Sequence, residues 1–152
     1  MRISATLTII GTFLALVGAP ASASTMSAVC KDVQGLRVDD TGEKLELDQD
    51  RLVDVSWAYT GDEKTNQGAL ILQSSKMAGG QPSVEKALVQ RMASGHWSFV
   101  SILGDAVWVH SIYPATGRLL VTQSTSGATG ALSGKMMAGK CKVTMRQAGL
   151  VT

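Results

Sequence analysis

The sequence predicts a mainly β domain: a small antiparallel barrel or two-layer sandwich of about seven strands with one short helix. Short runs in which apolar and polar residues alternate recur along the chain, and clusters of turn-forming residues separate them. Regular succession of short strands is typical of barrels and sandwiches. Two cysteines near the two ends of the domain agree with a closed structure. An α+β layer, with the helix across one face of a sheet, is the alternative architecture.

Residues 1–23 have the order of a secretory signal peptide. Arg2 precedes an apolar run over about residues 7–17, and the small residues Ala21, Ser22 and Ala23 follow it. The apolar run is shorter than the ~20 residues that a membrane-spanning helix needs. We therefore expect cleavage after Ala23, a single soluble domain over residues 24–152 without a membrane span, and a periplasmic or secreted location.

The remaining chain contains two cysteines, Cys30 and Cys141. In an oxidising compartment an even pair of cysteines favours a disulfide, and two cysteines allow one connectivity. A redox or metal-binding pair usually has close spacing such as C-x-x-C, which is absent here. The sequence thus predicts a disulfide that joins the two ends of the domain.

The first half of the domain contains the clearest strand. Residues 24–35 are mixed and favour one or two helical turns, and residues 39–50 favour a polar hairpin or loop. Alternation then begins at residue 53 and continues to residue 60, and residues 69–73 follow as a partner strand. The odd-numbered residues of the first run are expected to face the core: Val53, Val55, Trp57 and Tyr59.

The period changes after Pro82, where the sequence predicts a helix over residues 84–93. Ser83 is a suitable N-cap, and Gly95 is placed to end the helix. Apolar residues recur at helical spacing among strong helix formers. These residues are Val84, Ala87, Leu88 and Met92.

Residues 95–124 contain a central hairpin that carries most of the aromatic residues. Gly104-Asp105 predicts a type II′ turn, because glycine is favoured at the first central position of that turn. With Leu103 opposite Ala106, one face carries Trp97, Phe99, Leu103, Trp108, His110 and Ile112. The other face carries Val100, Ile102, Val107 and Val109, with His96 and Tyr113 at its open end. Both faces are apolar near the turn, so we expect a second layer to cover each of them.

The last part of the chain is expected to form two further strands. Residues 118–125 follow the turn at 114–117, and residues 126–134 are rich in small residues and favour a flexible connection. Residues 140–145, which include Cys141, are expected to form the strand that closes the domain.

The charges are divided between the two halves of the domain. Residues 31–63 contain ten acidic and four basic residues, whereas residues 64–152 contain two acidic and nine basic residues. Such halves attract each other within one folded domain. No basic cluster alternates with aromatic residues, so nucleic acid is not an expected partner.

The titratable residues do not form a recognisable catalytic or metal-binding motif. The two histidines, His96 and His110, are expected on opposite faces of the hairpin, and no nucleophile elbow G-x-S-x-G is present. We therefore expect neither a cofactor nor a resident metal. The alternative is a metal handler or a hydrolase that uses His96 or His110 with carboxylates from the acidic half.

The aromatic residues favour a binding function instead. In a small barrel, inward aromatic rings either fill the interior or line a pocket for one small apolar ligand. The sequence predicts a non-catalytic binding protein whose partner is a small ligand, an envelope polymer or another protein. The candidate contact residues are His96, Tyr113, Trp97, Trp108 and His110.

Overall fold

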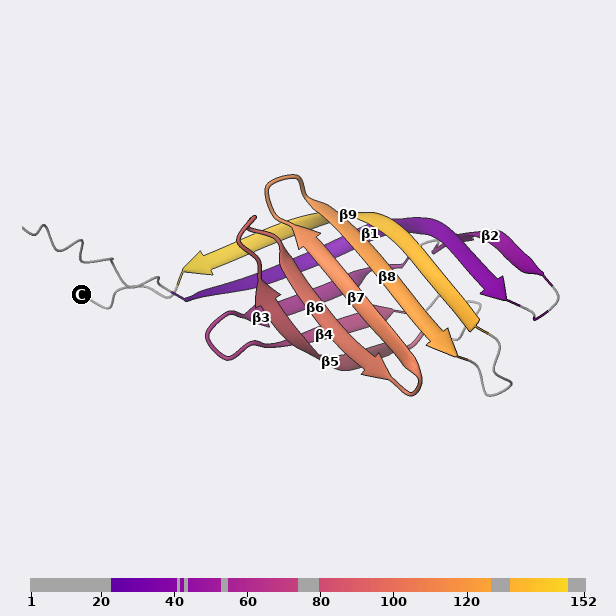
Figure 1. Cartoon of the computed structure of the whole chain (residues 1–152). Coiled ribbons are helices and arrows are strands. Elements are labelled where there is room, and N and C mark those ends of the chain that lie inside the picture. The colour runs from indigo at the N-terminus through magenta and orange to yellow at the C-terminus, as the bar shows by residue number, and fades with distance from the viewer. Residues whose placement is uncertain are drawn as a thin grey trace, which may run out of the picture.

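The computed structural model describes residues 23–40, 42, 44–52, 55–73, 80–126 and 132–147. Within these ranges the chain forms nine strands and no helix, so no helix that could cross a membrane occurs in them (Figure 1). The predicted signal peptide lies outside the described residues, except for Ala23. The strands are β1 (Ser24–Asp40), β2 (Leu45–Arg51), β3 (Trp57–Asp62), β4 (Gln67–Gln73), β5 (Pro82–Arg91), β6 (Trp97–Leu103), β7 (Ala106–Tyr113), β8 (Arg118–Ser126) and β9 (Leu132–Gln147).

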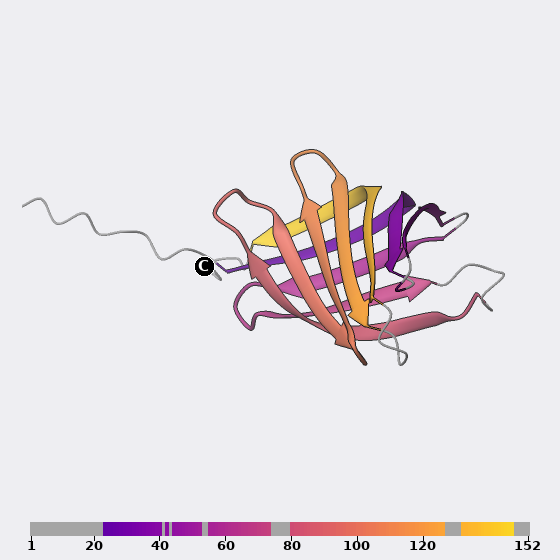
Figure 2. The same ribbon diagram turned by 45° about the vertical axis from the view of Figure 1, so that its right-hand side comes forward.

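The strands form one closed antiparallel barrel, which confirms the predicted barrel. The hydrogen-bonded order is β2-β1-β3-β4-β5-β6-β7-β8-β9, and β1 also pairs with β9, so that eight strands close on themselves (Figure 2). Closure leaves the eight barrel strands paired on both sides.

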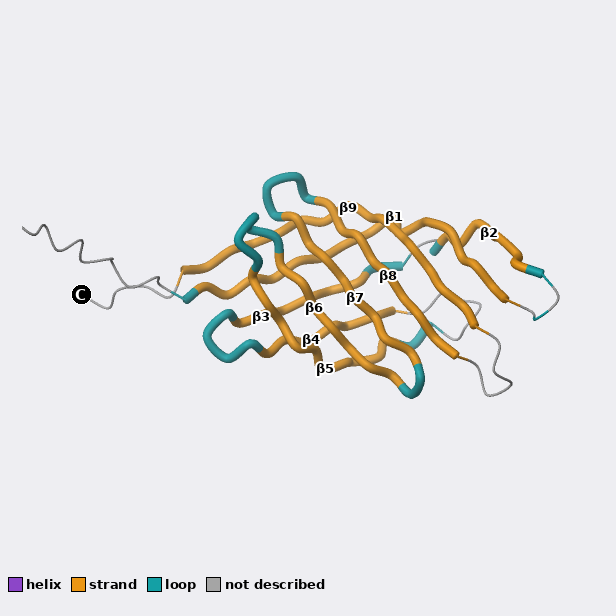
Figure 3. The backbone as a smooth tube through the Cα atoms, in the orientation of Figure 1, coloured by secondary structure: helices purple, strands orange, loops and turns teal. Residues whose placement is uncertain are grey.

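Strand β1 is long because it pairs with two different strands, one after the other, along the same side. Its first half pairs with β3 and its second half pairs with β2, while β9 pairs with both halves on the other side. The register shifts between Lys31 and Gln34, where Asp32 has a positive φ of 55°. This irregularity bends β1 and lets the β1–β2 hairpin extend beyond one end of the barrel (Figure 3). The helical turns that we expected over residues 24–35 are wrong, since the segment is part of β1.

The core lies inside the barrel and is aromatic. The largest fully buried side chains include Trp97, Tyr59, Phe99 and His110. Gly61 and Gly68 are cross-strand partners beside these rings, and a Cβ added to Gly68 would lie 3.0 Å from Cε1 of Phe99. The two glycines therefore leave the space that the Phe99 ring fills.

The central hairpin has the predicted register throughout. Leu103 is opposite Ala106, Trp97 is opposite Ile112, and Gly104 in the turn has a φ of 57°. The inner face of the hairpin packs into the core as expected. Its outer face has no second layer, however, because the barrel is a single closed sheet. Ile102 on that face is 70% exposed, so our expectation of two covered faces is wrong.

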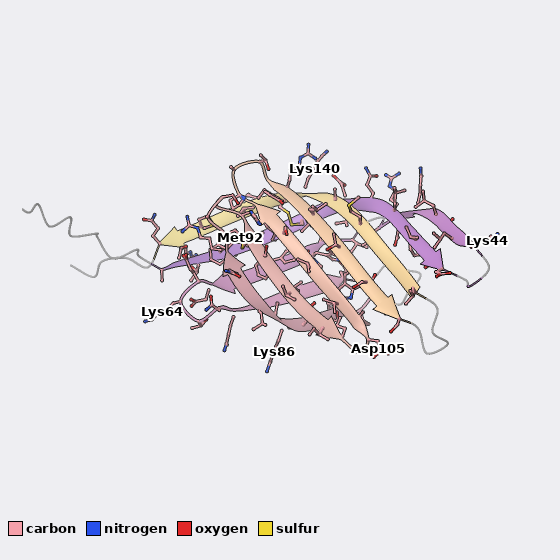
Figure 4. The ribbon with its side chains drawn as sticks, viewed as in Figure 1. Lys44, Lys64, Lys86, Met92, Asp105 and Lys140 are labelled. Carbon is pink, nitrogen blue, oxygen red and sulfur yellow. A yellow bond between two sulfur atoms is a disulfide. The ribbon has the colours of Figure 1, made fainter. Side chains whose placement is uncertain are left out.

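The predicted helix over residues 84–93 is also wrong, because residues 82–91 form β5. This strand pairs with β4 over residues 82–88 and with β6 over residues 88–91. Ala87 and Val89 point inward and are buried, whereas Val84 and Leu88 are 69% and 71% exposed. Lys86 points away from the barrel with them (Figure 4). The apolar residues at helical spacing thus lie on both faces of a strand.

The predicted disulfide is present and lies at the seam that closes the barrel. Cys30 in β1 is directly opposite Cys141 in β9, and the bond joins residues 111 positions apart in the sequence. Both cysteines are therefore in the disulfide, and Cys30 is completely buried.

Candidate functional site

The inner face of the barrel changes from buried to partly exposed toward one end. On β7, Ile112 and His110 are buried, and Trp108 and Ala106 are partly exposed. The same change occurs on β8, from Val121 to Gln123, and on β9, from Met137 to Lys135. All three strands change in the direction of the β6–β7 turn and the β1–β2 hairpin. We call this the β2 end of the barrel; the opposite end, where β1 begins at Ser24, is the Ser24 end.

Trp108 lies where the buried core gives way to the open β2 end. Its cross-strand partners on the same inner face are Ser101 in β6 and Gln123 in β8. Its ring stacks on the imidazole of His110, with centroids 5.8 Å apart and planes 23° apart. The tryptophan therefore presents a partly exposed aromatic surface between two polar side chains.

Several buried polar atoms around Trp108 have no hydrogen-bond partner within the described part of the chain. They are Oγ of Ser101, Oε1 of Gln123 and Nε2 of His110; Nε1 of Trp97 deeper in the core is a fourth. Buried polar atoms are nearly always hydrogen-bonded, and an unpartnered one costs about 1 to 3 kcal/mol. Next to Trp108, three buried polar atoms thus have hydrogen-bonding capacity that the described residues leave unused.

Charged side chains continue the same inner surface toward the β2 end. Lys135, the cross-strand partner of Gln123, forms an ion pair of 2.8 Å with Asp50 of β2, and both side chains are mostly buried. Arg37, the next partner along β1, contacts Asp39 at 2.6 Å and Asp48 at 3.6 Å. These two cations and three carboxylates are joined in ion pairs, so the surface is polar and carries only one net negative charge.

His110 is held inside the core and remains neutral. Its Nδ1 lies 2.9 Å from the hydroxyl of Tyr59, and the rings of Trp57, Tyr59 and Trp108 surround it. Burial lowers the pKa of His110 to about 4 and raises the pKa of Tyr59 well above its usual value. An imidazole with so low a pKa is a poor general base near neutral pH.

His96 and Tyr113 lie away from this site, on the outer face near the Ser24 end. Their rings stack with centroids 4.9 Å apart, as their predicted pairing implies. Nδ1 of His96 is 2.6 Å from Oγ of Ser94. The two histidines therefore lie on opposite faces of the barrel wall and do not share a site.

The predicted contact residues thus fall into three places. Trp108 and His110 are together at the inner site, His96 and Tyr113 are together outside, and Trp97 is fully buried in the core. Among the described residues, no three His, Cys, Asp or Glu side chains gather closely enough to hold a metal ion.

Three residues of this inner surface were not predicted from the sequence: Gln123, Lys135 and Asp50. The alternation along its strand could have identified Gln123, because Leu119, Val121 and Gln123 are all odd-numbered and therefore lie on the same face of the strand. Lys135 and Asp50 meet only because β1 pairs with both β2 and β9, which no local pattern indicates.

Comparison with known proteins gives no match: no family model fits the chain, no curated protein is similar to it in sequence, and no solved structure matches its fold.

Proposed function

We propose that this protein is a non-catalytic binding protein that holds a small, mainly apolar molecule at the β2 end of the barrel, against Trp108. The observation that carries the proposal is the partly exposed Trp108 ring with unpartnered Ser101 and Gln123 atoms on both sides. Ligand sites are mostly apolar with a few placed polar groups, and the mouth of a β-barrel is a common location.

The chemistry of the inner surface defines the ligand class. An aromatic or alicyclic ring would stack on Trp108, and a polar substituent would bond to the Lys135–Asp50 pair or, once their buried side chains reorient, to Ser101 and Gln123. The paired charges favour a neutral or dipolar molecule over a strongly charged one. An envelope polymer or a protein partner would need the outer surface instead, which makes it a separate outcome of the test.

Catalysis receives less support from the described residues. His110 is neutral, buried and already bonded to Tyr59, and His96 is on the other face of the wall with Ser94 as its partner. Among the described residues, no carboxylate bonds to His96 to complete a hydrolase triad with Ser94, and no group of three ligands could hold a metal ion. We therefore propose that the Trp108 ring and the Gln123 amide bind a ligand and take no part in a reaction.

The disulfide supports a location in an oxidising compartment, either the periplasm or the extracellular space. The signal peptide expected over residues 1–23 agrees with that location. A ligand at the β2 end would then be a molecule met outside the cytoplasm.

The neutral fluorescent probe N-phenyl-1-naphthylamine tests the proposed site. It has two aromatic ring systems and one polar group, and its emission rises in an apolar environment. We expect it to bind the full exported protein, and Trp108→Ala to weaken binding about tenfold, because the stacking surface is lost. A fluorescence titration of each protein gives the two dissociation constants.

The matched control is Ile102→Ala, on the outer face of the same hairpin. Ile102 is 70% exposed, so removing it should leave the inner site and the probe's dissociation constant unchanged. Binding that is lost in Ile102→Ala and retained in Trp108→Ala would place the probe outside the barrel and contradict the proposal. Native mass spectra of the exported protein should also show an adduct that Trp108→Ala lacks.

A further inference from the structure

The first residue of β1, Ser24, forms three hydrogen bonds with one glutamate, Glu63. The backbone N–H of Ser24 donates to Oε2 of Glu63 at 3.1 Å, and the Ser24 hydroxyl donates to the same oxygen at 2.6 Å. The N–H of Glu63 in turn donates to the carbonyl oxygen of Ser24 at 3.0 Å. Ser24 is only 3% exposed, and its hydroxyl also accepts a hydrogen bond from Nη1 of Arg91 at 3.4 Å, so its polar groups are bound by protein groups.

Glu63 lies in the β3–β4 turn at the Ser24 end, near Lys64 in Figure 4. The turn is itself fixed, because Asp62 accepts hydrogen bonds from the backbone N–H groups of Lys64 and Thr65. Arg91 approaches from β5, with Nη1 3.5 Å from Oε2 of Glu63. The fixed turn and Arg91 thus help to hold Glu63 beside Ser24, and the Ser24 hydroxyl lowers the pKa of Glu63 most.

We infer that Ser24 is the first residue of the mature protein and that its α-ammonium group, formed by cleavage of the Ala23–Ser24 bond, makes an ion pair with Glu63. The inference is independent of the proposed ligand function. It joins two separate observations: the small residues Ala21, Ser22 and Ala23, which are typical of a signal peptidase site, and a carboxylate 3.1 Å from the nitrogen that such cleavage releases.

The cleavage is an ordinary hydrolysis by a signal peptidase of the exporting cell. Water adds across the amide, the C–N bond between Ala23 and Ser24 breaks, Ala23 leaves as a carboxylate, and the Ser24 nitrogen takes a proton. The amide donor in the uncleaved chain thereby becomes a cation. The bond to the ionised Glu63 has one charged partner before cleavage and two after it, so cleavage adds a direct charge–charge attraction to the contact.

Burial of Ser24 also indicates whether cleavage or closure of the barrel comes first. A peptidase needs an extended, accessible segment, whereas Ser24 in the folded barrel is hydrogen-bonded in β1 and buried. Cleavage therefore precedes the closure of the barrel. The new terminus then fixes β1 to the β3–β4 turn, beside the β1–β9 seam.

The first test is the N-terminus of the full chain after export from a bacterial host. Mass spectrometry of the purified protein should show a polypeptide that begins at Ser24. A protein that keeps residues 1–23, or that begins at a different residue, would overturn the inference.

The second test is a double-mutant cycle on melting temperature. Chains that begin at Ser24 and at Ala23 are compared, each with Glu63 and with Glu63→Gln, and all with the disulfide formed. The extra residue moves the ammonium away from Glu63, so the Ala23 chain should melt about 3 °C lower. This difference should disappear in the Glu63→Gln pair.

Glu46→Gln is the matched control, because Glu46 is an exposed glutamate that pairs with Lys44 in the β1–β2 hairpin. The difference between the Ser24 and Ala23 chains should persist in this background. Equal melting temperatures for the two chains with Glu63 present, or a difference that survives in Glu63→Gln, would show that the ammonium does not pair with Glu63.

Discussion

Replacing Cys30 and Cys141 together with alanine is expected to lower the free energy of unfolding by about 4 to 5 kcal/mol. The bond closes a segment of 111 residues, and a cross-link over so long a segment removes much entropy from the unfolded chain. For a domain of this size, the loss corresponds to a fall in melting temperature of roughly 10 °C or more. Urea unfolding followed by far-UV circular dichroism measures the change.

The effect is large because of where the disulfide lies. β1 and β9 are the first and last strands of the barrel in the sequence, and their pairing closes it. In the unfolded chain without the bond, the two strands are separated by almost the whole domain. The native pairs remain available in the variant, so we expect a closed but less stable barrel.

A reducing agent provides the control for this prediction. It should lower the stability of the wild-type protein to that of the Cys30→Ala/Cys141→Ala variant and should leave the variant unchanged. A double variant within about 1 kcal/mol of the oxidised wild type would contradict the argument. It would mean that the unfolded chain already keeps β1 and β9 together.

The central hairpin was predictable from sequence because its register depends on one local feature. The Gly104-Asp105 turn fixes the pairing from Leu103–Ala106 to Trp97–Ile112, and all of these pairs are present. The same register placed His96 beside Tyr113 on the outside and His110 on the inside. Local turn chemistry thus determined which face each candidate residue occupies.

The error at residues 84–93 has a different physical origin. Glu85, Lys86, Ala87 and Leu88 are good helix formers, but intrinsic propensity is a weak preference that tertiary pairing overrides. As a strand, β5 hydrogen-bonds to backbone groups of both β4 and β6 along the residues that pair. A helix at this place would leave those groups of β4 and β6 unpaired. Burial of Ala87 and Val89 alone is enough to fix its inner face.

The candidate site was only half predictable for a related reason. Trp108 and Ser101 are opposite each other in the hairpin, so the sequence could place them together. Gln123 required the register of the next hairpin, and the Lys135–Asp50 pair required β1 to change partners at its irregularity. Contacts between strands that are distant in sequence depend on barrel closure, which no single segment encodes.

Stability should also fall by about 3 kcal/mol as the pH is lowered from about 6.5 to 4, because of His110. Burial lowers the pKa of His110 from 6.5 to about 4, so the unfolded chain takes up a proton in this range and the folded chain does not. The stabilisation is therefore fully present above pH 6.5 and is lost as the pH falls toward 4. Urea unfolding at a series of pH values measures the slope.

The matched variant is His110→Gln, whose amide can donate to or accept from the Tyr59 hydroxyl but does not titrate. Carboxylates such as Glu63 contribute equally to both proteins, so the difference between the two curves isolates His110. The wild type should lose more stability than the variant between pH 6.5 and 4, and parallel curves would contradict the assignment. Should the variant fail to fold, the wild-type NMR spectrum decides the question, because the His110 ring must still be neutral at pH 5.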